Sequence, residues 1–374
     1  MQKITFSKNT TPFFPTLQKA VNDYFKTNNL KPTGNKSLYA KTLILIPSAL
    51  ALYITLVFFT PPVAISIALA AVLGLISASI GFSVMHDACH GSYSTKKWVN
   101  EIIGLSLNCL GGNAFLWKQK HNEIHHTYTN IDGVDEDIAK IPLLRQCATQ
   151  PFMKIHKMQH IYIFMLYGFS SIIWIAYMDF IKYFQGRILN TQIRNLDTKE
   201  HVIFWTSKVL YAVVYIAIPI YFVGWLPWLV GFFAMHFVMG LMLGIVFQLA
   251  HVVEITHFEH ITSDSLHIES EWAIHQINTT ANFARKNKII NWYVGGLNYQ
   301  VEHHLFPRVS HVHYPAISKI VESVCKDFNV TYNDFPTMWS AIGSHYRFMR
   351  ELGKPNAIQP PFVKKAEEQL SYAS

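Results

Sequence analysis

Seven histidines form three tight clusters, each beside a long apolar stretch of the chain. The clusters read HDACH over residues 86–90, HNEIHH over 121–126 and QVEHH over 300–304. Residues three or four apart on a helix share a face, so the imidazoles within a cluster converge. Neutral imidazole suits iron, zinc, copper and nickel. The candidate metal ligands are His86, His90, His121, His125, His126, His303 and His304.

The number of these imidazoles favours two metal ions. A structural zinc needs only about four ligands, and seven exceed what one ion accepts at an ordinary coordination number. His126 is rotated about one step from His125, and we expect it to reach a second centre. Gln300 opens the third cluster on the face of His303 and His304. It either ligates through its side-chain oxygen or orients a neighbouring ligand.

The elements that must position these clusters are membrane helices. The chain of 374 residues is 51% hydrophobic and only 14% charged. Residues 42–85 and 209–250 contain no Lys, Arg, Asp or Glu. A helix needs about 20 residues to cross a bilayer, so each stretch is long enough for a helical hairpin. Pro61-Pro62 and the run from Gly224 to Pro227 lie near the two midpoints, where tight turns belong. A buried hairpin of a soluble protein fits less well, because two such stretches far exceed ordinary core helices.

The predicted fold is therefore all-α and integral to the membrane, with four transmembrane helices in two hairpins and a cytoplasmic helical cap that carries the two-metal site. Seven lysines and one acid precede Thr42, and short basic flanks stay in the cytoplasm. A third apolar run, 161–181, would place the third cluster on the opposite side if it crossed. We assign it to the membrane interface or the protein interior. The short run 99–117 is assigned to a re-entrant or surface-lying segment.

The remaining segments are expected to be cytoplasmic. Residues 1–41 lack the apolar core of a signal peptide, and 11–29 predict an amphipathic helix on the membrane surface. The membrane domain that carries the three clusters spans 42–330, and 331–374 predict a helix and a loose tail. Helices are expected to begin at Pro315 and Pro336.

Four scattered cysteines argue against a disulfide framework, and the net charge of +8 fits anionic headgroups or an acidic partner. The basic residues form no dense stripe, so no nucleic-acid partner is expected.

Other polar residues near the clusters have more than one interpretation. His236 lies mid-membrane, where we predict a hydrogen-bonded packing role, and His311 and His313 are expected at the surface or against headgroups. Metal-bound imidazoles usually donate their second N–H to a carboxylate or carbonyl. Candidates for that partner are Asp87, Asp135, Asp137, Glu254 and Glu302. For Asp135 and Asp137 a solvated loop is an equal alternative. Arg285, Lys286, Lys288 and Arg308 either attract a phosphate-bearing headgroup or simply flank the membrane.

The three clusters, their order and the hairpins between them resemble the integral-membrane fatty acid desaturase family. The string GGLNYQVEHHLFP over residues 295–307 is especially specific. A Gln at the head of the third cluster resembles the front-end and linoleoyl-CoA-type branch. His275, in the run WAIHQ, is similar to a stretch in which related enzymes place a further ligand. We expect His275, and His251 at the end of the second hairpin, to be ligands or their direct neighbours.

The resemblance implies a di-iron enzyme that uses O2 and two electrons to insert a cis double bond into an acyl chain, held as an acyl-CoA or an acyl-lipid. The seven cluster histidines would hold the irons, with no separate catalytic side chain. Many front-end relatives carry a fused haem domain, but this sequence has no His-Pro-Gly-Gly motif. Electrons are therefore expected from a separate ferredoxin or cytochrome b5-like donor.

Two other classes of function remain open at this point. Membrane hydroxylases of alkyl, sterol or carotenoid substrates use the same histidine scaffold and share the hydrogen-abstraction step. A non-enzymatic metal transporter would need histidines or carboxylates along a path through both hairpins. Those hairpins hold only His236 in mid-span, which argues against transport.

Overall fold

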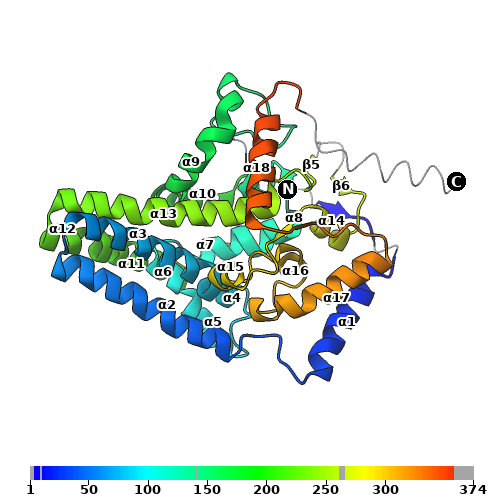
Figure 1. Ribbon diagram of the computed structural model, residues 1–374, viewed down its shortest axis with the longest axis horizontal. Helices are drawn as coiled ribbons and strands as arrows, with labels where there is room; N and C mark the ends of the chain where they lie inside the picture. The colour runs from blue at the N-terminus through cyan, green and yellow to red at the C-terminus, as the bar shows by residue number, and fades with distance from the viewer. Residues whose placement is uncertain (1–3, 9–10, 140, 261–265, 358–374) are drawn as a thin grey trace.

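The structure, a computed structural model, describes residues 4–8, 11–139, 141–260 and 266–357. It is mainly helical, and each described strand has only two residues and pairs with one other strand (Figure 1). The first apolar stretch forms the expected hairpin, with its turn at Thr60, Pro61 and Pro62. Its elements are α2 (Lys36–Ile54), the π-helical turn η1 (Thr55–Phe59), α3 (Val63–Ile80), the π-helical turn η2 (Gly81–Met85) and α4 (His86–Cys89).

The second apolar stretch also forms a hairpin, but its first helix begins earlier than the uncharged run. The elements are α11 (Thr198–Ala212), the π-helical turn η7 (Val213–Ala217), α12 (Ile218–Val223) and α13 (Trp225–His251). Gly224 makes the turn with φ of +86°, a backbone conformation that glycine adopts without steric cost. The helix α13 ends at His251, so this hairpin returns the chain to the histidines.

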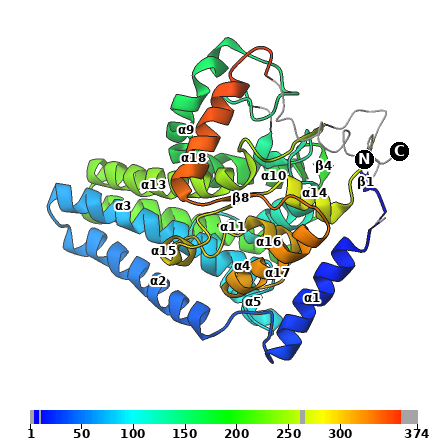
Figure 2. The same cartoon turned by 45° about the vertical axis from the view of Figure 1, so that its right-hand side comes forward.

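The two hairpins pack closely against each other through α3 and α13. A Cβ atom added to Gly74 would lie 2.3 Å from the backbone oxygen of Met235, so only glycine permits this approach. Figures 1 and 2 show α2, α3 and α13 running side by side. The histidine-bearing helices α4 and α16 (Gln300–Leu305) lie beyond one end of this bundle.

The third apolar run forms one long helical unit: α9 (Gln159–Ile173), the π-helical turn η6 (Trp174–Met178) and α10 (Asp179–Gln185). Both views show α9 steeply inclined to α13 (Figures 1 and 2). With the hairpins, the described residues contain five helices that are long and apolar enough to cross a membrane. The protein is thus an integral membrane protein in which the third run is a full helix.

Contacts at both ends of this unit tie it to the side of the molecule that carries the histidines. Near its start, Gln159 Nε2 donates to the backbone oxygens of Arg145 and Met349. Just after its end, the backbone N–H of Arg194 donates to Gln119 Oε1, two residues before His121. A hairpin of β3 (Arg187–Ile188) and β4 (Thr191–Gln192) follows α10.

The segment between the first two clusters is broken into short helices, which agrees with the expectation that it does not cross as one span. These are α5 (Lys97–Gly104), α6 (Ser106–Cys109) and α7 (Ala114–Lys118). Asn113 begins α7 because its side-chain oxygen accepts a hydrogen bond from the backbone N–H of Leu116. The chain then continues into the π-helical turn η3 (Gln119–His125) and α8 (His126–Tyr128), which carry the second cluster.

The described segments on the histidine side of the bundle, called the cap below, come from the two ends of the chain and from the long segment after α13. Three parallel strand pairs join distant segments: β1 (Thr5–Phe6) with β6 (His267–Ile268), β2 (Ile131–Asp132) with β5 (Glu259–His260), and β7 (Asn282–Phe283) with β8 (Asp334–Phe335). Its remaining helices are α1 (Phe13–Thr27), α14 (Trp272–Asn278), α15 (Lys288–Tyr293), α17 (Tyr314–Asp327) and α18 (Met338–Leu352). The helices expected at Pro315 and Pro336 are confirmed within two residues. Most of the expected tail after Gly353 lies outside the described residues.

One expectation for the cap is wrong. The amphipathic helix α1 forms, but its apolar face does not lie on a membrane surface. Phe13, Leu17, Val21 and Phe25 are buried in a cluster with Ile317 and other side chains of α17. The apolar stripe of α1 is therefore part of the protein core, and only its polar face is exposed.

Candidate metal centre

Four helical segments deliver imidazoles to one buried region, although the first and third clusters are more than two hundred residues apart in the sequence. α4 supplies His86, η3 supplies His121 and His125, α13 ends in His251, and α16 supplies His303 and His304. The π-helical turn η2 ends directly before His86, and η3 contains His121 and His125. Such turns change the helical register locally and are frequent at functional sites. All seven cluster histidines are buried.

The imidazoles separate into two main groups. His86, His90, His121 and His303 form one group, and His125, His251 and His304 form the second, with one ring nitrogen of each residue within 4.8 Å of the others in its group. His126 shares such a group with His303 and His304, and its Nε2 lies 3.2 Å from His121 Nε2. His126, which was expected to reach a second centre, lies between the two groups. His125 is the residue of the second cluster that belongs to the second group.

Unpaired nitrogens show that the residues fit metal ions. Within this region, and among the described residues, the buried ring nitrogens without a hydrogen-bond partner are Nε2 of His86, His90, His125, His251, His303 and His304, and Nδ1 of His126. A buried polar atom without a partner costs on the order of 1–3 kcal/mol, so seven in one place require another occupant. Two groups of three or four neutral imidazoles with open lone pairs match the donor sets of first-row metals.

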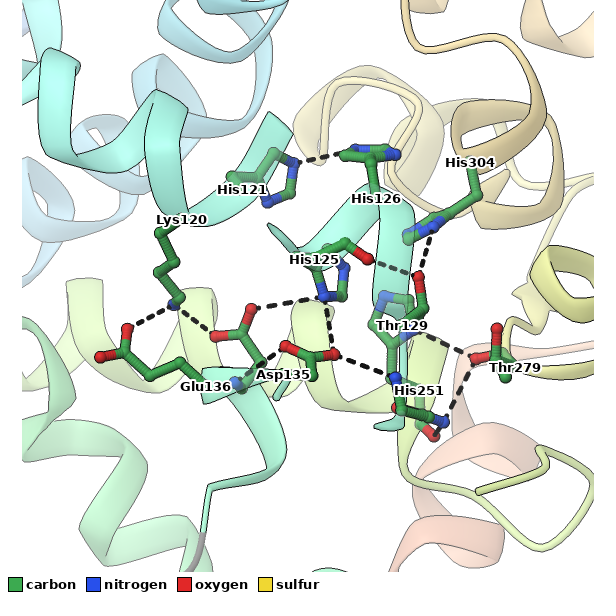
Figure 3. Close-up of polar contacts among 12 residues, drawn as sticks. Lys120, His121, His125, His126, Thr129, Asp135, Glu136, His251, Thr279 and His304 are labelled. Atoms are coloured by element: carbon green, nitrogen blue, oxygen red, sulfur yellow. Dashed lines mark hydrogen bonds and ion pairs between the residues drawn. The ribbon is translucent and has the colours of Figure 1, made fainter. Parts of the chain in front are cut away.

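The second ring nitrogens of His125, His251 and His304 are held by fixed partners, of which Figure 3 shows Asp135 and Thr279. His125 Nδ1 donates to Asp135 Oδ2 at 3.0 Å, and His251 Nδ1 donates to the backbone oxygen of Thr279 at 3.2 Å. His304 Nδ1 donates to Gln276 Oε1 at 2.8 Å. These bonds leave Nε2 as the free nitrogen and fix the plane of each ring.

The third cluster has a similar partner on the other side of the site. His303 Nδ1 forms a hydrogen bond of 3.1 Å with the hydroxyl of Tyr314, a buried residue at the start of α17. The Tyr314 ring is nearly inaccessible to solvent. The packing of α17 against α16 therefore controls the orientation of a ligand candidate.

Burial keeps most of the imidazoles neutral. Desolvation, with smaller contributions from neighbouring imidazoles, holds the pKa of His121, His126, His303 and His304 well below the usual value. Burial also acts to lower the pKa of His125, but the charge and hydrogen bond of Asp135 raise it above the usual value. Neutral imidazole is the form that binds a metal, so His121, His126, His303 and His304 are in the metal-binding form at neutral pH.

A network of charges surrounds Asp135 (Figure 3). Asp137 lies 3.5 Å from His125 Nδ1 and pairs with Lys120, which also contacts Glu136. Glu136 in turn pairs with Lys182 of α10 at 2.5 Å. Of the two alternatives for Asp135 and Asp137, the structure therefore favours contact with a ligand over a solvated loop.

Of the predicted site residues outside the seven cluster histidines, His251 belongs to a metal group, whereas Gln300 and His275 do not. Gln300 is buried, and its Nε2 donates to the backbone oxygen of Leu297 while its side chain faces His251. His275 is in neither metal group, because its Nε2 is bonded to the backbone oxygen of Thr129 at 2.9 Å. His251 is thus brought to the centre, and His275 instead holds the segment that follows the second cluster.

The other candidate carboxylates do not touch the metal groups. Asp87 binds Ser310 and His311, Glu302 binds Tyr332 and Asn282, and Glu254 pairs with Arg347 at the surface. The surface position expected for His311 and His313 is wrong, since both are buried. Arg285 pairs with Glu322 and Asp334, which leaves it less available to a headgroup.

His236 has the packing role predicted for it. It is fully buried in α13, with Nδ1 3.1 Å from Ser171 Oγ and Nε2 2.6 Å from the hydroxyl of Tyr211. Both ring nitrogens are therefore satisfied within the bundle.

An apolar cavity of about 570 Å³ lies between the hairpin turns, lined by Tyr53, Tyr215 and Trp228 among others. The turns are at the opposite end of the hairpins from the histidines.

A second cleft reaches the metal groups from the surface. It has a volume of about 980 Å³ and includes His90 and His126 among its lining residues. Side chains of α5 and η3 line its walls, together with Pro307 and Arg308. This cleft therefore opens toward His90 of the first group and toward His126, whereas His125, His251 and His304 of the second group are not among its lining residues.

Sequence comparison places these features among known proteins. The model of the family described as fatty acid desaturase matches residues 32–336. The chain is 36% identical to an sn-1 linoleoyl-lipid 6-desaturase of Arthrospira platensis, over 99% of this chain and 98% of the relative. It is 36% identical to an acyl-lipid (8-3)-desaturase of Physcomitrium patens, over 91% and 72% respectively. It is 35% identical to an sn-1 linoleoyl-lipid 6-desaturase of Synechocystis sp., over 90% and 94%.

Proposed function

The chain belongs to the fatty acid desaturase family, and on that premise we propose that it inserts a cis double bond into an acyl-lipid or acyl-CoA at a histidine-held pair of irons. The protein is an oxidoreductase of this family. The observation that carries the proposal is the set of seven buried imidazole nitrogens that face one another without a partner. Acyl-lipid relatives similar over nearly the whole chain favour a lipid-bound acyl chain as substrate.

In this proposal each main group of imidazoles holds one iron. His86, His90, His121 and His303 would hold the first, and His125, His251 and His304 the second, with His126 between them. Gln300 would orient His251. The irons supply the redox chemistry that an alkyl C–H bond requires, since it offers no acid–base handle. Overall, one –CH2–CH2– unit, O2, two electrons and two protons yield –CH=CH– and two waters.

The side chains of this protein contribute position and burial. Asp135, Thr279, Gln276 and Tyr314 hold the ligand rings in single orientations. The buried surroundings exclude bulk water from the reacting carbons, apart from the cleft at His90 and His126. Electrons would come from a separate donor such as a ferredoxin or a cytochrome b5-like protein, which the net charge of +8 helps to attract if the donor is acidic.

We also propose four membrane crossings, with the metal centre and both termini on the cytoplasmic side. The two hairpins account for four of the five apolar helices. The fifth, α9 to α10, would lie across the bundle near the interface, because contacts at both its ends join it to segments beside the histidines. Seven lysines before Thr42 favour a cytoplasmic N-terminus.

Expression in a host that lacks polyunsaturated lipids tests the activity. The host is fed defined fatty acids and supplied with a ferredoxin and its reductase, and its lipids are analysed by mass spectrometry. A new double bond in the wild type, absent in His303→Ala at equal protein level, supports the proposal. Hydroxylated chains would instead assign the alternative of a membrane hydroxylase. No oxygen-dependent product with either class of donor would contradict both.

A further inference from the structure

The helix α10 carries two buried charges, three residues apart, that pair with different segments. Asp179 pairs with Lys208 of α11 at 2.8 Å, and Lys182 pairs with Glu136 at 2.5 Å. The two lysines are similarly buried, with 8% and 5% of their side chains exposed. The pair at Asp179 joins α10 to the second hairpin, whereas the pair at Glu136 joins it to the loop beside the metal ligand candidate His125.

Glu136 belongs to a run of three acids, 135–137, that shares two lysines (Figure 3). Lys120 Nζ contacts Asp137 Oδ1 directly and lies 3.8 Å from Glu136 Oε2, the same oxygen that Lys182 binds. Opposite charges attract strongly where water is largely excluded. The position of Lys120 therefore depends on whether Glu136 already has another cation. While Lys182 neutralises Glu136, Lys120 stays on Asp137.

Asp137 has a second oxygen close to the ligand ring. Among the described residues, Asp137 Oδ2 is buried without a hydrogen-bond partner, and it lies 3.5 Å from His125 Nδ1. The N–H of His125 donates instead to Asp135 Oδ2, at 3.0 Å. Two carboxylates thus compete for one N–H. A bond to Asp137 in place of Asp135 would rotate the imidazole and displace Nε2, its free nitrogen.

We propose that Lys182 is a positioning residue for His125 and that it acts through Glu136, Lys120 and Asp137. By neutralising Glu136, Lys182 leaves Lys120 to Asp137. A neutralised Asp137 does not compete for the N–H of His125, so the ring keeps the orientation that points Nε2 into the second group of imidazoles. The inference rests on the proposed role of His125 in holding iron. It concerns only the second group, because the first group does not contain His125.

Release of iron to a chelator tests the two groups separately. Full-length protein in mild detergent is loaded with Fe2+ under argon and mixed with an excess of a chelator that forms a coloured Fe2+ complex. In Lys182→Met, one of the two bound ions should leave about tenfold faster than in the wild type, the lower end of the effect of changing a direct partner of a metal ligand. The other ion should leave at the wild-type rate. Lys182→Arg keeps the charge and should restore slow release of both ions.

A second substitution separates positioning from a simple loosening of α10. Glu136→Gln, added to Lys182→Met, removes the acid that draws Lys120 away from Asp137. Release of both ions should then be slow again. The double variant also lacks the ion pair between α10 and the acidic run, so a role limited to holding the helix in place predicts no such recovery.

Lys208→Met is the matched control. It removes a similarly buried lysine from a carboxylate of the same helix, but that carboxylate, Asp179, otherwise accepts a hydrogen bond from Trp174 and contacts none of the three acids. Lys208→Met should lower the Tm and leave the release of both ions unchanged. Selective acceleration of one ion in this variant, as in Lys182→Met, would overturn the inference, because any loosened contact of α10 would then suffice.

Wild-type release of both ions from Lys182→Met would overturn the inference and leave the proposed function intact. Equal acceleration of both ions, or no recovery with Glu136→Gln, would overturn it as well. Where Lys182→Met yields no folded protein, Lys182→Gln, which keeps a donor for Glu136 without the charge, carries the same expectations. A wild type that holds no iron would contradict the proposed function itself, and the inference with it.

Discussion

At the residue scale, Asp135 is the most informative neighbour of the metal ligands. Its Oδ2 accepts hydrogen bonds from His125 Nδ1 and from the backbone N–H of Asn130, and its Oδ1 accepts one from the N–H of Asp137. One buried carboxylate thus fixes the ligand ring and the backbone of the loop that follows. Such partners raise the basicity of a metal-bound imidazole as well as orienting it.

Replacement of Asp135 should therefore lower the affinity of the imidazoles for metal, although Asp135 contacts only His125 among them. We expect Asp135→Leu to lower metal affinity and turnover by about 10–100-fold. Asp135→Asn keeps an oxygen that accepts from His125, so its loss should be smaller. Metal content by mass spectrometry and turnover in the same preparations measure both effects.

Glu254 supplies the matched control for that experiment. It is also an acid close in sequence to a ligand candidate, but its carboxylate pairs with Arg347 on the surface. Glu254→Gln should keep wild-type metal content and turnover. If Glu254→Gln and Asp135→Leu lose metal equally, the specific role of the Asp135–His125 bond is refuted.

The convergence of the ligand candidates was predictable from the sequence, whereas their hydrogen-bond partners were not. Imidazoles at fixed spacing beside apolar stretches form a pattern that few other sites share, and all seven converge. Thr129, Gln276 and Tyr314 are neutral residues of common types, and no spacing relates them to the clusters. His275 and His251 differ only in where the fold places them, because α13 ends at the centre whereas α14 faces Thr129.

At the element scale, the contact between α9 and α13 depends on glycines. A Cβ atom added to Gly240 would lie 2.7 Å from the backbone oxygens of Gly168 and Tyr167, neither of which is a flexible side-chain end. By contrast, nothing lies within 4 Å of a Cβ added to Gly231 on the same helix. These two glycines therefore offer a matched pair of tests.

We expect Gly240→Ala to destabilise the protein by about 1–3 kcal/mol, the usual cost of overpacking. Gly231→Ala should be neutral or stabilising by up to about 1 kcal/mol, because alanine favours a helix. Thermal unfolding of both variants in one detergent measures the difference. An unchanged Tm for Gly240→Ala would show that α9 does not pack on α13 as closely as described.

The inclined helix from α9 to α10 makes a prediction about sidedness. Single cysteines are introduced at Asn28, Thr60 and Asn190, all exposed, in a background where exposed Cys109 is replaced by Ser. A membrane-impermeant thiol reagent should label positions 28 and 190 from the same side and position 60 from the other. Labelling of Asn190→Cys together with Thr60→Cys would mean that α9 to α10 crosses the membrane.

The patterns that predict elements do not predict what those elements contact. The two hairpins are evident because their uncharged length has no other common explanation. The amphipathic stripe of α1 is different, since the same spacing fits a membrane surface and a protein core. The cap is held by two-residue parallel strand pairs between segments that are more than fifty residues apart, and such short strands carry no recognisable periodicity.

At the scale of the whole molecule, the candidate metal centre is the point where the two hairpins and the cap meet. α4 continues the first hairpin, α13 ends the second, and η3 and α16 belong to the intervening and following segments. The first group of imidazoles comes from α4, η3 and α16, and the second comes from η3, α13 and α16. The binding free energy of metals held by these groups would therefore also contribute to folding. Removal of the metals should thus loosen the entire histidine side of the protein.

We expect metal removal to lower the Tm of the wild type, because ligands that bind only the folded state stabilise it by about 4 kcal/mol at a thousandfold excess over Kd. The buried nitrogens left unpaired add to this cost. Chelator-treated and iron-reloaded protein are compared by thermal unfolding. His303→Ala should show a lower Tm and a smaller response to chelator, whereas a Tm independent of chelator in the wild type would contradict a structural role for the metals.

The pH dependence of metal retention follows from the same burial. A proton competes with the metal for the free nitrogen of each imidazole. Since burial holds the pKa of His126 and His304 well below the usual value, these nitrogens stay unprotonated at pH values where a surface histidine is already charged. Iron should therefore remain bound after dialysis at pH 6 and be released only in more acidic buffer. Release that follows the titration of an ordinary histidine, near pH 6.5, would mean that the imidazoles are solvated and that the two groups do not close around their metals.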